Sequence, residues 1–470
     1  MIKIITHNEK LLDELNLILK LFYSVEDIEE KDIEFVVEQT INNRDIRTIS
    51  YSNINDFSVT RNDNIIDMSF PDRYKKRYAK LALFEVLQNI FPYKILPWGS
   101  LTGIRPTKLY YELIKECNGD YMKAMNVLID TFKVTSEKAQ LVKEIIKNQN
   151  NIIKNDKLVD LYINIPFCPS KCYYCSFISA PIDKCRDELE PYLDALMKEI
   201  EATKQLIERK NYIVKSIYIG GGTPTILSAE QLDRLLSSID YNVSEFTVEC
   251  GRPDTITKEK LDVLQNHNVT RISINPQSFC NKTLKSIGRN HTSQDIIDAY
   301  RLALNYNFSI NMDFIAGLGN ETLTTFKRSL NKAIECYPDN ITIHTLSIKR
   351  GSELKTDGGD TSKESSVQKM IEYSYPTLIQ AGYKPYYMYK QKNMLGNLEN
   401  IGYFRDKVSI FNIDSMEEFA SIIACGANAI SKRYYSLNNK IERWANLKNI
   451  REYINRIDEM ISKKNALFES

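Results

Sequence analysis

The 470-residue sequence is short of histidine and tryptophan and has no excess of either charge. It contains only four His and two Trp residues, and 62 Lys plus Arg residues nearly balance 61 Asp plus Glu residues, for a net charge of +1. A balanced surface produces no overall field that attracts a polyanion. We therefore expect no nucleic-acid partner.

Long hydrophobic runs are also missing. The longest uncharged apolar stretches, such as Phe419–Ser431, fall short of the ~20 residues that a membrane helix needs. The first residues meet Glu9 and Lys10 without a long apolar core or a small-residue cleavage site, so they do not resemble a signal peptide. We expect no membrane span and a cytoplasmic location.

Cysteine is sparse, and its distribution argues against a disulfide framework. The nine cysteines are an odd number in a long chain, a pattern that suits ligation or redox chemistry better than secreted disulfides. The hydrophobic fraction of 43% and the charged fraction of 26% are those of a folded globular protein. The length exceeds one ordinary domain, so we expect a barrel with smaller domains attached.

The first third of the chain mixes short β-like runs with amphipathic helical patterns. Strands are indicated at residues 2–6, 35–37 and 49–51, and helices at 11–18, 74–90, 108–117 and 122–132. The polar stretch Lys147–Lys157 reads as a helix end and linker. We predict an N-terminal α+β domain of unknown role over residues 1–155.

Short apolar strands then alternate with long amphipathic helices. The strand candidates are residues 160–165, 216–219, 246–249, 271–274, 310–314 and 341–344. Such alternation predicts an α/β fold with a parallel sheet and right-handed crossovers. Six units cannot close an eight-stranded barrel, so residues 156–350 are predicted to form a partial (β/α)6 TIM-like barrel. The remaining residues, 351–470, are predicted to form a C-terminal extension or lid.

Three cysteines crowd into one loop directly after the first barrel strand. Cys168, Cys172 and Cys175 form a C-x3-C-x2-C pattern on the face where barrel enzymes place their active sites. Thiolates suit zinc or iron-sulfur clusters, and three of them leave one iron of a four-iron cluster without a protein ligand. Structural zinc is the alternative, but it prefers four closed ligands. Cys185 is ten residues further on and the histidines are scattered, so we favour the cluster.

A glycine-rich segment follows the second strand, Gly220-Gly-Gly-Thr-Pro-Thr225. Backbone without side chains can approach a ligand closely there. Together with an aromatic residue before the third cysteine, these motifs resemble the radical S-adenosylmethionine (SAM) superfamily. The resemblance implies that a [4Fe-4S] cluster bound by Cys168, Cys172 and Cys175 cleaves SAM to a 5'-deoxyadenosyl radical, which takes hydrogen from the substrate.

The closer resemblance is to the oxygen-independent coproporphyrinogen III oxidase group, in its coproporphyrinogen dehydrogenase branch. It covers nearly the whole chain. The matching motifs are Tyr162–Cys168, Gly220–Thr225, Glu249, Asn275–Ser278, Gly288-Arg289, Met312-Asp313 and Gly426–Ser431, with Trp98–Thr107 and Tyr389–Met394 resembling that branch in particular. The resemblance implies that SAM is contacted by Tyr162, Tyr174, Gly221, Gly222, Thr223, Glu249, Gln277, Arg289 and Asp313, and also by Ser347 and Ile430.

The implied reaction is the oxidative decarboxylation of two propionates of coproporphyrinogen III to vinyl groups, giving protoporphyrinogen IX in anaerobic haem synthesis. The implied partners are a tetrapyrrole substrate and an electron donor of the flavodoxin or ferredoxin type. Cationic partners for substrate carboxylates could come from Lys349, Arg350, Lys390 and Lys392.

The sequence departs from the group at three positions. The oxidases carry a further cysteine where this chain has Phe177, and a histidine where it has Asn164. Haem-chaperone relatives carry a haem-binding histidine where this chain has Glu399, and a carboxylate is a weak substitute for imidazole as a haem ligand. Two alternatives stay open: a haem-binding or haem-transfer protein, and a different radical SAM enzyme that acts on tetrapyrroles.

Overall fold

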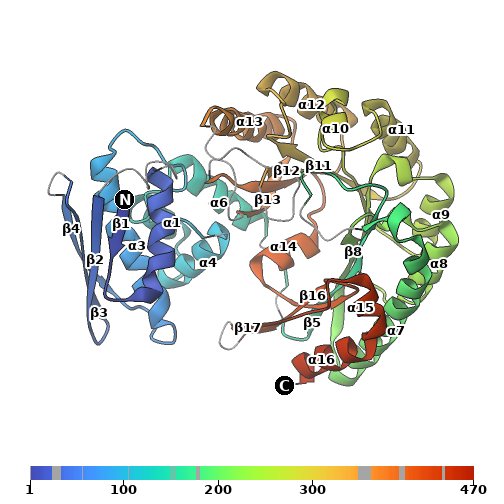
Figure 1. The fold of residues 1–470 in the computed structure, drawn as a ribbon, viewed down its shortest axis with the longest axis horizontal. Coiled ribbons are helices and arrows are strands. Elements are labelled where there is room, and N and C mark those ends of the chain that lie inside the picture. Colours follow the sequence, from blue (N-terminus) through green and yellow to red (C-terminus); the bar gives the residue numbers. More distant parts are fainter. Residues whose placement is uncertain are drawn as a thin grey trace. The chain divides into compact units, whose positions relative to one another are not determined.

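The protein was studied as a computed structural model, which describes residues 2–23, 33–54, 57–103, 105–149, 152–153, 155–175, 180–347, 361–390, 397–436 and 440–469. The chain divides into two compact units, and the division falls between Lys147 and Asn148, at the start of the polar stretch that the sequence indicates as a linker. Each unit is considered by itself (Figure 1).

The N-terminal unit combines a small sheet with helices. Its elements are β1 (Ile2–Ile5), α1 (Leu12–Phe22), β2 (Ile33–Asn42), β3 (Asp45–Ser52), β4 (Ser58–Asn64), α3 (Pro71–Ile90), α4 (Pro106–Glu116), α5 (Tyr121–Asp130) and α6 (Ser136–Asn148). The sheet order is β1-β2-β3-β4, with β1 parallel to β2 and the other pairs antiparallel. Side chains alternate between buried and exposed along β3, so one face packs on α1 and α3. Their core includes Phe22, whose ring meets Phe84 edge-on at 5.4 Å.

The C-terminal unit is built on one long sheet of eleven strands in the described part of the chain. In spatial order they are β13 (Lys384–Tyr389), β14 (Asn400–Phe404), β12 (Asn340–Thr345), β11 (Ser309–Ala316), β10 (Arg271–Ile274), β9 (Glu245–Gly251), β8 (Ile213–Gly221), β5 (Leu158–Ile165), β15 (Ser421–Cys425), β16 (Ile430–Tyr435) and β17 (Lys440–Ala445). The predicted strands are β5 and β8–β12, which all run parallel to one another. The α/β partial-barrel prediction is confirmed.

The part of the chain predicted as an extension or lid adds five strands to that sheet. β15 pairs with β5 in parallel, so the parallel sheet has a seventh strand that comes from the C-terminal region. β14 and β13 continue the sheet antiparallel beyond β12, and β16 and β17 do so beyond β15. The C-terminal region is therefore a structural part of the barrel sheet.

Helices cover the outer face of the sheet, as Figure 1 shows for α7 to α12. The helices of this unit are α7 (Leu189–Lys210), α8 (Ala229–Ser237), α9 (Lys258–Asn266), α10 (Asn281–Ser286), α11 (Ser293–Ala303), α12 (Leu323–Cys336), α13 (Thr361–Gln380), α14 (Ile410–Glu417), α15 (Ile450–Asn455) and α16 (Ile457–Glu469). Capping boxes at Ser228, Thr292 and Thr322 begin α8, α11 and α12, because these side chains accept hydrogen bonds from otherwise unpaired backbone N–H groups.

Helix α14 is the exception, because it lies inside the curve of the sheet (Figure 1). The buried carboxylate of Glu245 accepts hydrogen bonds from the backbone N–H groups of Ile410 at 2.7 Å and Phe411 at 3.0 Å. A carboxylate is stabilised at a helix N-terminus by the helix dipole. Phe411 stacks on Tyr218 of β8 with a centroid separation of 4.4 Å. These contacts hold α14 in the lumen of the barrel.

A membrane-spanning helix is not found in the described part of the chain, since none of its helices is both long and apolar enough.

Candidate active site

A cavity of about 350 Å³ opens at the carboxyl ends of the parallel strands. This is the edge at which barrel enzymes bind their substrates. The structure brings most of the predicted site residues together there, namely Cys168, Cys172, Tyr174, Cys175, Gly221, Gly222, Thr223, Glu249, Gln277, Arg289, Asp313 and Ser347. They come from segments more than a hundred residues apart, so only the barrel topology places them side by side.

Two predicted contacts do not line this cavity. Tyr162 lies beside it, with its ring 6.2 Å from that of Tyr218 and 5.9 Å from that of Phe411, and its hydroxyl donates to Asn164 Oδ1 at 3.0 Å. Ile430 is 45% exposed at the start of β16. The structure thus places Tyr162 next to the cavity, while Ile430 begins β16, which runs antiparallel between β15 and β17 outside the parallel strands.

The cysteine loop is fastened at several points. The Tyr173 N–H donates to the Ile287 carbonyl at 3.1 Å, and the Thr223 hydroxyl donates to Cys168 Sγ at 3.5 Å. Cys172 is buried, whereas Cys168 and Cys175 are half-buried. Among the residues that the structure describes, no three His, Cys, Asp or Glu side chains are close enough to hold a metal ion. Three soft thiol donors nevertheless share one loop at the cavity.

The glycine segment packs against the end of the first barrel strand. Gly221 has φ +105°, and a Cβ atom there would collide with Asn164 Oδ1. The Gly222 N–H donates to the Ile165 carbonyl at 2.8 Å, and the Thr223 N–H donates to the Phe167 carbonyl at 2.8 Å. The sequence predicts close approach of this backbone to a ligand. The structure shows that the close approach is to the protein itself, at the rim of the cavity.

Two carboxyl groups line the cavity, and their pKa values are shifted in opposite directions. Burial raises the pKa of Glu249 to about 7, although a hydrogen bond from Tyr218 at 2.5 Å opposes that rise. Burial would also raise the pKa of Asp313, but interactions with His344 and Asn311 prevail and lower it. The Asn311 amide donates to Asp313 at 2.8 Å, and His344 Nε2 lies 3.8 Å away. Asp313 is therefore the anionic group, and it has protein partners of the kind that burial requires.

Arg289 is the cation beside the cysteine loop. It is buried, and it donates to the Asn275 carbonyl at 2.5 Å and to the Tyr174 hydroxyl at 3.3 Å. Burial alone would lower its pKa, but Tyr174 and Cys172 raise it. This buried environment is not that of a surface ion pair. A permanent positive charge lies next to the thiols.

Several cavity residues were not predicted from the sequence. They are Tyr218, Arg252, His344, Tyr387, Tyr389, Asn400, Asn412 and Met416, among others. Tyr218 could have been predicted, because it lies two residues before Gly220 of the glycine-rich segment. Residues at that spacing on a strand point to the same face. Tyr387, Tyr389 and Asn400 come from β13 and β14, whose pairing with the barrel sheet had no local signal.

Of the four cationic residues suggested as partners for substrate carboxylates, the structure describes only Lys390. Lys390 directly follows β13 and is buried, so it does not lie on the solvent-exposed surface. Lys349, Arg350 and Lys392 lie outside the described residues, as does Phe177. Glu399 is buried, and its backbone carbonyl accepts a hydrogen bond from Thr345 at 2.9 Å.

Comparison with known proteins agrees with this geometry. The sequence profile of the Radical SAM superfamily matches residues 162–333. The chain is 39% identical, over 79% of its length and 78% of the relative's, to the oxygen-independent coproporphyrinogen-III oxidase-like protein HemZ of Bacillus subtilis. The chain belongs to this radical SAM family. Radical SAM proteins use a [4Fe-4S] cluster and SAM.

A heme chaperone and a solved oxidase structure are also similar to this radical SAM protein. It is 30% identical to the heme chaperone HemW of Lactococcus lactis, over 66% of this chain and 79% of that one. Among solved structures, the coproporphyrinogen III oxidase HemN of Escherichia coli, described as a radical SAM enzyme, matches with a TM-score of 0.50 and 21% identity over 65% of this chain and 70% of that one. The last match establishes the fold alone.

Proposed function

We propose that this radical SAM protein oxidatively decarboxylates two propionates of coproporphyrinogen III to vinyl groups, giving protoporphyrinogen IX in anaerobic haem synthesis. One observation supports it most: Cys168, Cys172 and Cys175 line the same cavity as Glu249 and Asp313. The likeness to the coproporphyrinogen-III oxidase-like protein over most of both chains adds the substrate class.

The three cysteines would hold the cluster, and the donor set fits it. Three thiols leave one iron free for another ligand, and the buried guanidinium group of Arg289 lies beside Cys172. Binding of the cluster would require the three sulfur atoms to move closer together, because their positions in this structure do not form a metal-binding group. When bound, the cluster and SAM supply one-electron chemistry that removes a hydrogen atom from an unactivated carbon.

The surrounding side chains would orient SAM and keep water out. Asp313, held ionised, can accept hydrogen bonds from hydroxyl or ammonium groups, and Gln277 offers a side-chain oxygen that lacks a partner. Arg289 can pair with a carboxylate. We propose the same role for the other predicted contacts that line the cavity, Tyr174, Gly221, Gly222, Thr223, Glu249 and Ser347.

The remaining assignments belong to this proposal. The substrate is a tetrapyrrole whose propionates need cationic partners, and the single electrons come from a donor of the flavodoxin or ferredoxin type. We propose a cytoplasmic location and no nucleic-acid partner. The polar, nearly neutral composition is in keeping with both.

An anaerobic assay tests the reaction. Reconstituted protein is incubated with coproporphyrinogen III, dithionite and SAM, and the tetrapyrroles are separated by mass. We expect loss of two carboxyl groups as carbon dioxide, and no product from Cys172→Ala. Unchanged substrate together with cleaved SAM refutes this substrate. A methylated or ring-opened product from haem in the same assay identifies the different radical SAM enzyme instead.

Haem transfer is the second candidate, because a heme chaperone is 30% identical over two thirds of this chain. Glu399 argues against it, since it replaces the haem-binding histidine of those relatives and lies buried. Anaerobic titration with haem separates the two functions. We expect no stoichiometric complex. Tight one-to-one haem binding that is lost in Glu399→Ala favours the transfer function.

A further inference from the structure

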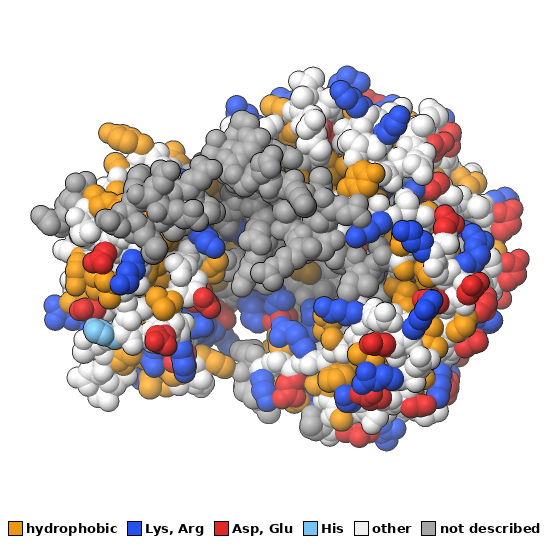
Figure 2. Space-filling view, in the orientation of Figure 1, with side chains coloured by type: hydrophobic (Ala, Val, Ile, Leu, Met, Phe, Trp, Pro, Cys, Tyr) orange, Lys and Arg blue, Asp and Glu red, His pale blue; other side chains and the backbone are white. Residues whose placement is uncertain are grey.

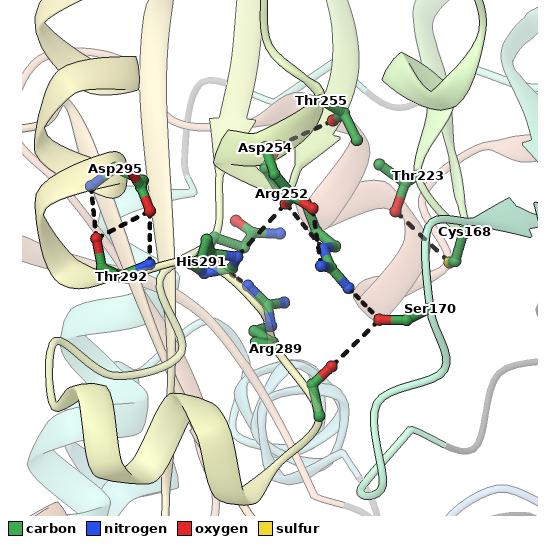
Figure 3. A network of polar contacts seen from close by, with 12 residues as sticks. Cys168, Ser170, Thr223, Arg252, Asp254, Thr255, Arg289, His291, Thr292 and Asp295 are labelled. Atoms are coloured by element: carbon green, nitrogen blue, oxygen red, sulfur yellow. Dashed lines mark hydrogen bonds and ion pairs between the residues drawn. The ribbon is translucent and has the colours of Figure 1, made fainter.

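A chain of polar contacts runs from the cysteine loop into the outer helices of the barrel (Figure 3). It starts at Ser170, which lies between the first two cysteines. The Ser170 hydroxyl donates to the Gly288 carbonyl at 3.2 Å and accepts a hydrogen bond from Arg252 Nη1 at 2.7 Å. Ser170 and Arg252 are 82 residues apart in the sequence. One serine hydroxyl thus joins the cysteine loop to two other loops.

Arg252 is placed by its own strand and locked by a carboxylate. It follows Gly251 at the end of β9, and its side chain is 4% exposed. Its Nε donates to Asp254 Oδ1 at 3.0 Å and its Nη2 to Asp254 Oδ2 at 2.8 Å. A two-point contact of this kind fixes the plane of the guanidinium group and aims Nη1 in one direction. That direction is Ser170.

The buried imidazole of His291 lies beside Asp254. The His291 Nδ1 lies 3.4 Å from Asp254 Oδ1, and its side chain is 1% exposed. Burial would raise the pKa of Asp254, but His291 and Arg252 lower it well below its usual range. The carboxylate therefore stays charged and accepts both hydrogen bonds from Arg252. Figure 3 shows His291, Asp254, Arg252 and Ser170 in one line.

The geometry points to Arg252 as a positioning residue for the cysteine loop, acting through Ser170 and oriented by Asp254 and His291. Each of the three guanidinium nitrogens of Arg252 donates a hydrogen bond within this line. A rigid loop reduces the entropy that is lost when three thiols are brought to one metal cluster. This inference rests on the proposed role of the three cysteines as cluster ligands.

Cysteine alkylation in the cluster-free full-length protein tests the anchor without any cofactor. Ser170→Ala removes one hydroxyl, and we expect iodoacetamide to modify Cys172 about tenfold faster, since a hydrogen bond to a charged group is worth ~1.5 kcal/mol. Mass spectrometry gives the rate for each cysteine. The fully buried Cys250 and Cys425 serve as internal references, and their rates should not change.

A double-mutant cycle shows whether Arg252 acts through Ser170. Arg252→Gln should accelerate modification of Cys172 at least as much as Ser170→Ala, and the double variant no more than Arg252→Gln. Ser238→Ala is the matched control, because that hydroxyl donates only to the Leu235 carbonyl, at 2.6 Å. Wild-type reactivity of Cys172 in Ser170→Ala overturns the inference, and so do effects that multiply in the double variant.

Cluster retention then separates this inference from the proposed function. After anaerobic reconstitution, Ser170→Ala should lose iron to a chelator about tenfold faster than wild type, with an unchanged urea midpoint. Equal rates of iron loss contradict the positioning role. A wild-type protein that takes up no iron refutes the proposed function, while the alkylation cycle still decides whether Arg252 anchors the loop.

Discussion

The hydroxyl of Tyr218 lies 2.5 Å from Oε1 of Glu249, on neighbouring strands β8 and β9. Without this donor the carboxyl group would be harder still to ionise, since burial already raises its pKa to about 7. Glu249 is therefore a group that changes its charge near neutral pH within the cavity.

Glu249→Gln should change how stability depends on pH. A carboxyl whose pKa is higher in the folded state than in the unfolded state destabilises the fold as pH rises from about 4.5 to about 7. We expect the cofactor-free variant to gain stability over wild type between pH 5 and pH 8, by up to ~3 kcal/mol. Urea unfolding at both pH values measures this. A constant difference between the two proteins contradicts the raised pKa.

Replacing any one of Cys168, Cys172 or Cys175 with Ala should remove most iron and all SAM cleavage. The reason is that each thiolate would supply one of three protein ligands to the cluster. Iron analysis and visible absorption after anaerobic reconstitution measure the loss. Cys336→Ala, on the outer helix α12, is the matched control. Full cluster absorption in the triple variant disproves the ligand assignment.

Asp313→Asn should keep the fold and the cluster but weaken SAM binding. The loss of one charged hydrogen bond, worth ~1.5 to 3 kcal/mol, corresponds to roughly tenfold to a hundredfold in affinity. Equilibrium binding with the cluster intact measures it. Asp298→Asn, an exposed change on α11, should leave affinity unchanged. Equal affinities in the two variants make Asp313 a structural residue of the barrel.

Gly221→Ala should destabilise the protein more than Gly382→Ala. Both glycines have positive φ, +105° and +88°, so each substitution introduces backbone strain. Only at Gly221 does the added Cβ meet another atom, Asn164 Oδ1. The difference between the two urea midpoints isolates the collision, which we expect to cost about 1 to 3 kcal/mol. Equal midpoints show that the Gly221 loop can shift freely.

Lys464→Met should be strongly destabilising. The Lys464 ammonium lies 2.9 Å from Glu199, and both side chains are fully buried. Removing one partner of a buried pair leaves an uncompensated charge, at a cost of about 3 to 5 kcal/mol. Lys463→Met, which breaks an exposed pair with Glu459, should cost no more than ~1 kcal/mol. Thermal unfolding compares the two, and similar melting temperatures contradict the assignment.

The local part of the fold could be predicted from the sequence. The strands β5 and β8–β12 were found because short apolar runs alternate with helices of clear periodicity. The strand β4 was not found, since none of its seven residues is buried and its sequence carries no apolar alternation. The strand β15 is fully buried, but a five-residue segment with four apolar side chains does not reveal that it pairs with a strand some 260 positions earlier.

The candidate site was predictable where motifs fall at strand ends. Cys168, Glu249 and Asp313 lie at or just beyond the carboxyl ends of predicted parallel strands, so the topology brings them to one cavity. Ile430 does not line the described cavity, and its role stays a prediction, because resemblance to a motif carries no information about the antiparallel course of β16. The contact between Ser170 and Arg252 was missed for a similar reason: each side chain is unremarkable until the two loops are folded together.

The last of the parallel strands to be synthesised is β15, which pairs with β5, the first of them. Residues 159–163 have one unpaired edge until residues 421–425 have been synthesised and pair with them. Until then Asn164 lacks the Ala427 carbonyl, to which its amide donates at 2.7 Å, and Gly221 lacks a fixed neighbour. A chain that stops before residue 421 therefore leaves the strand that leads into the cysteine loop with one unpaired edge.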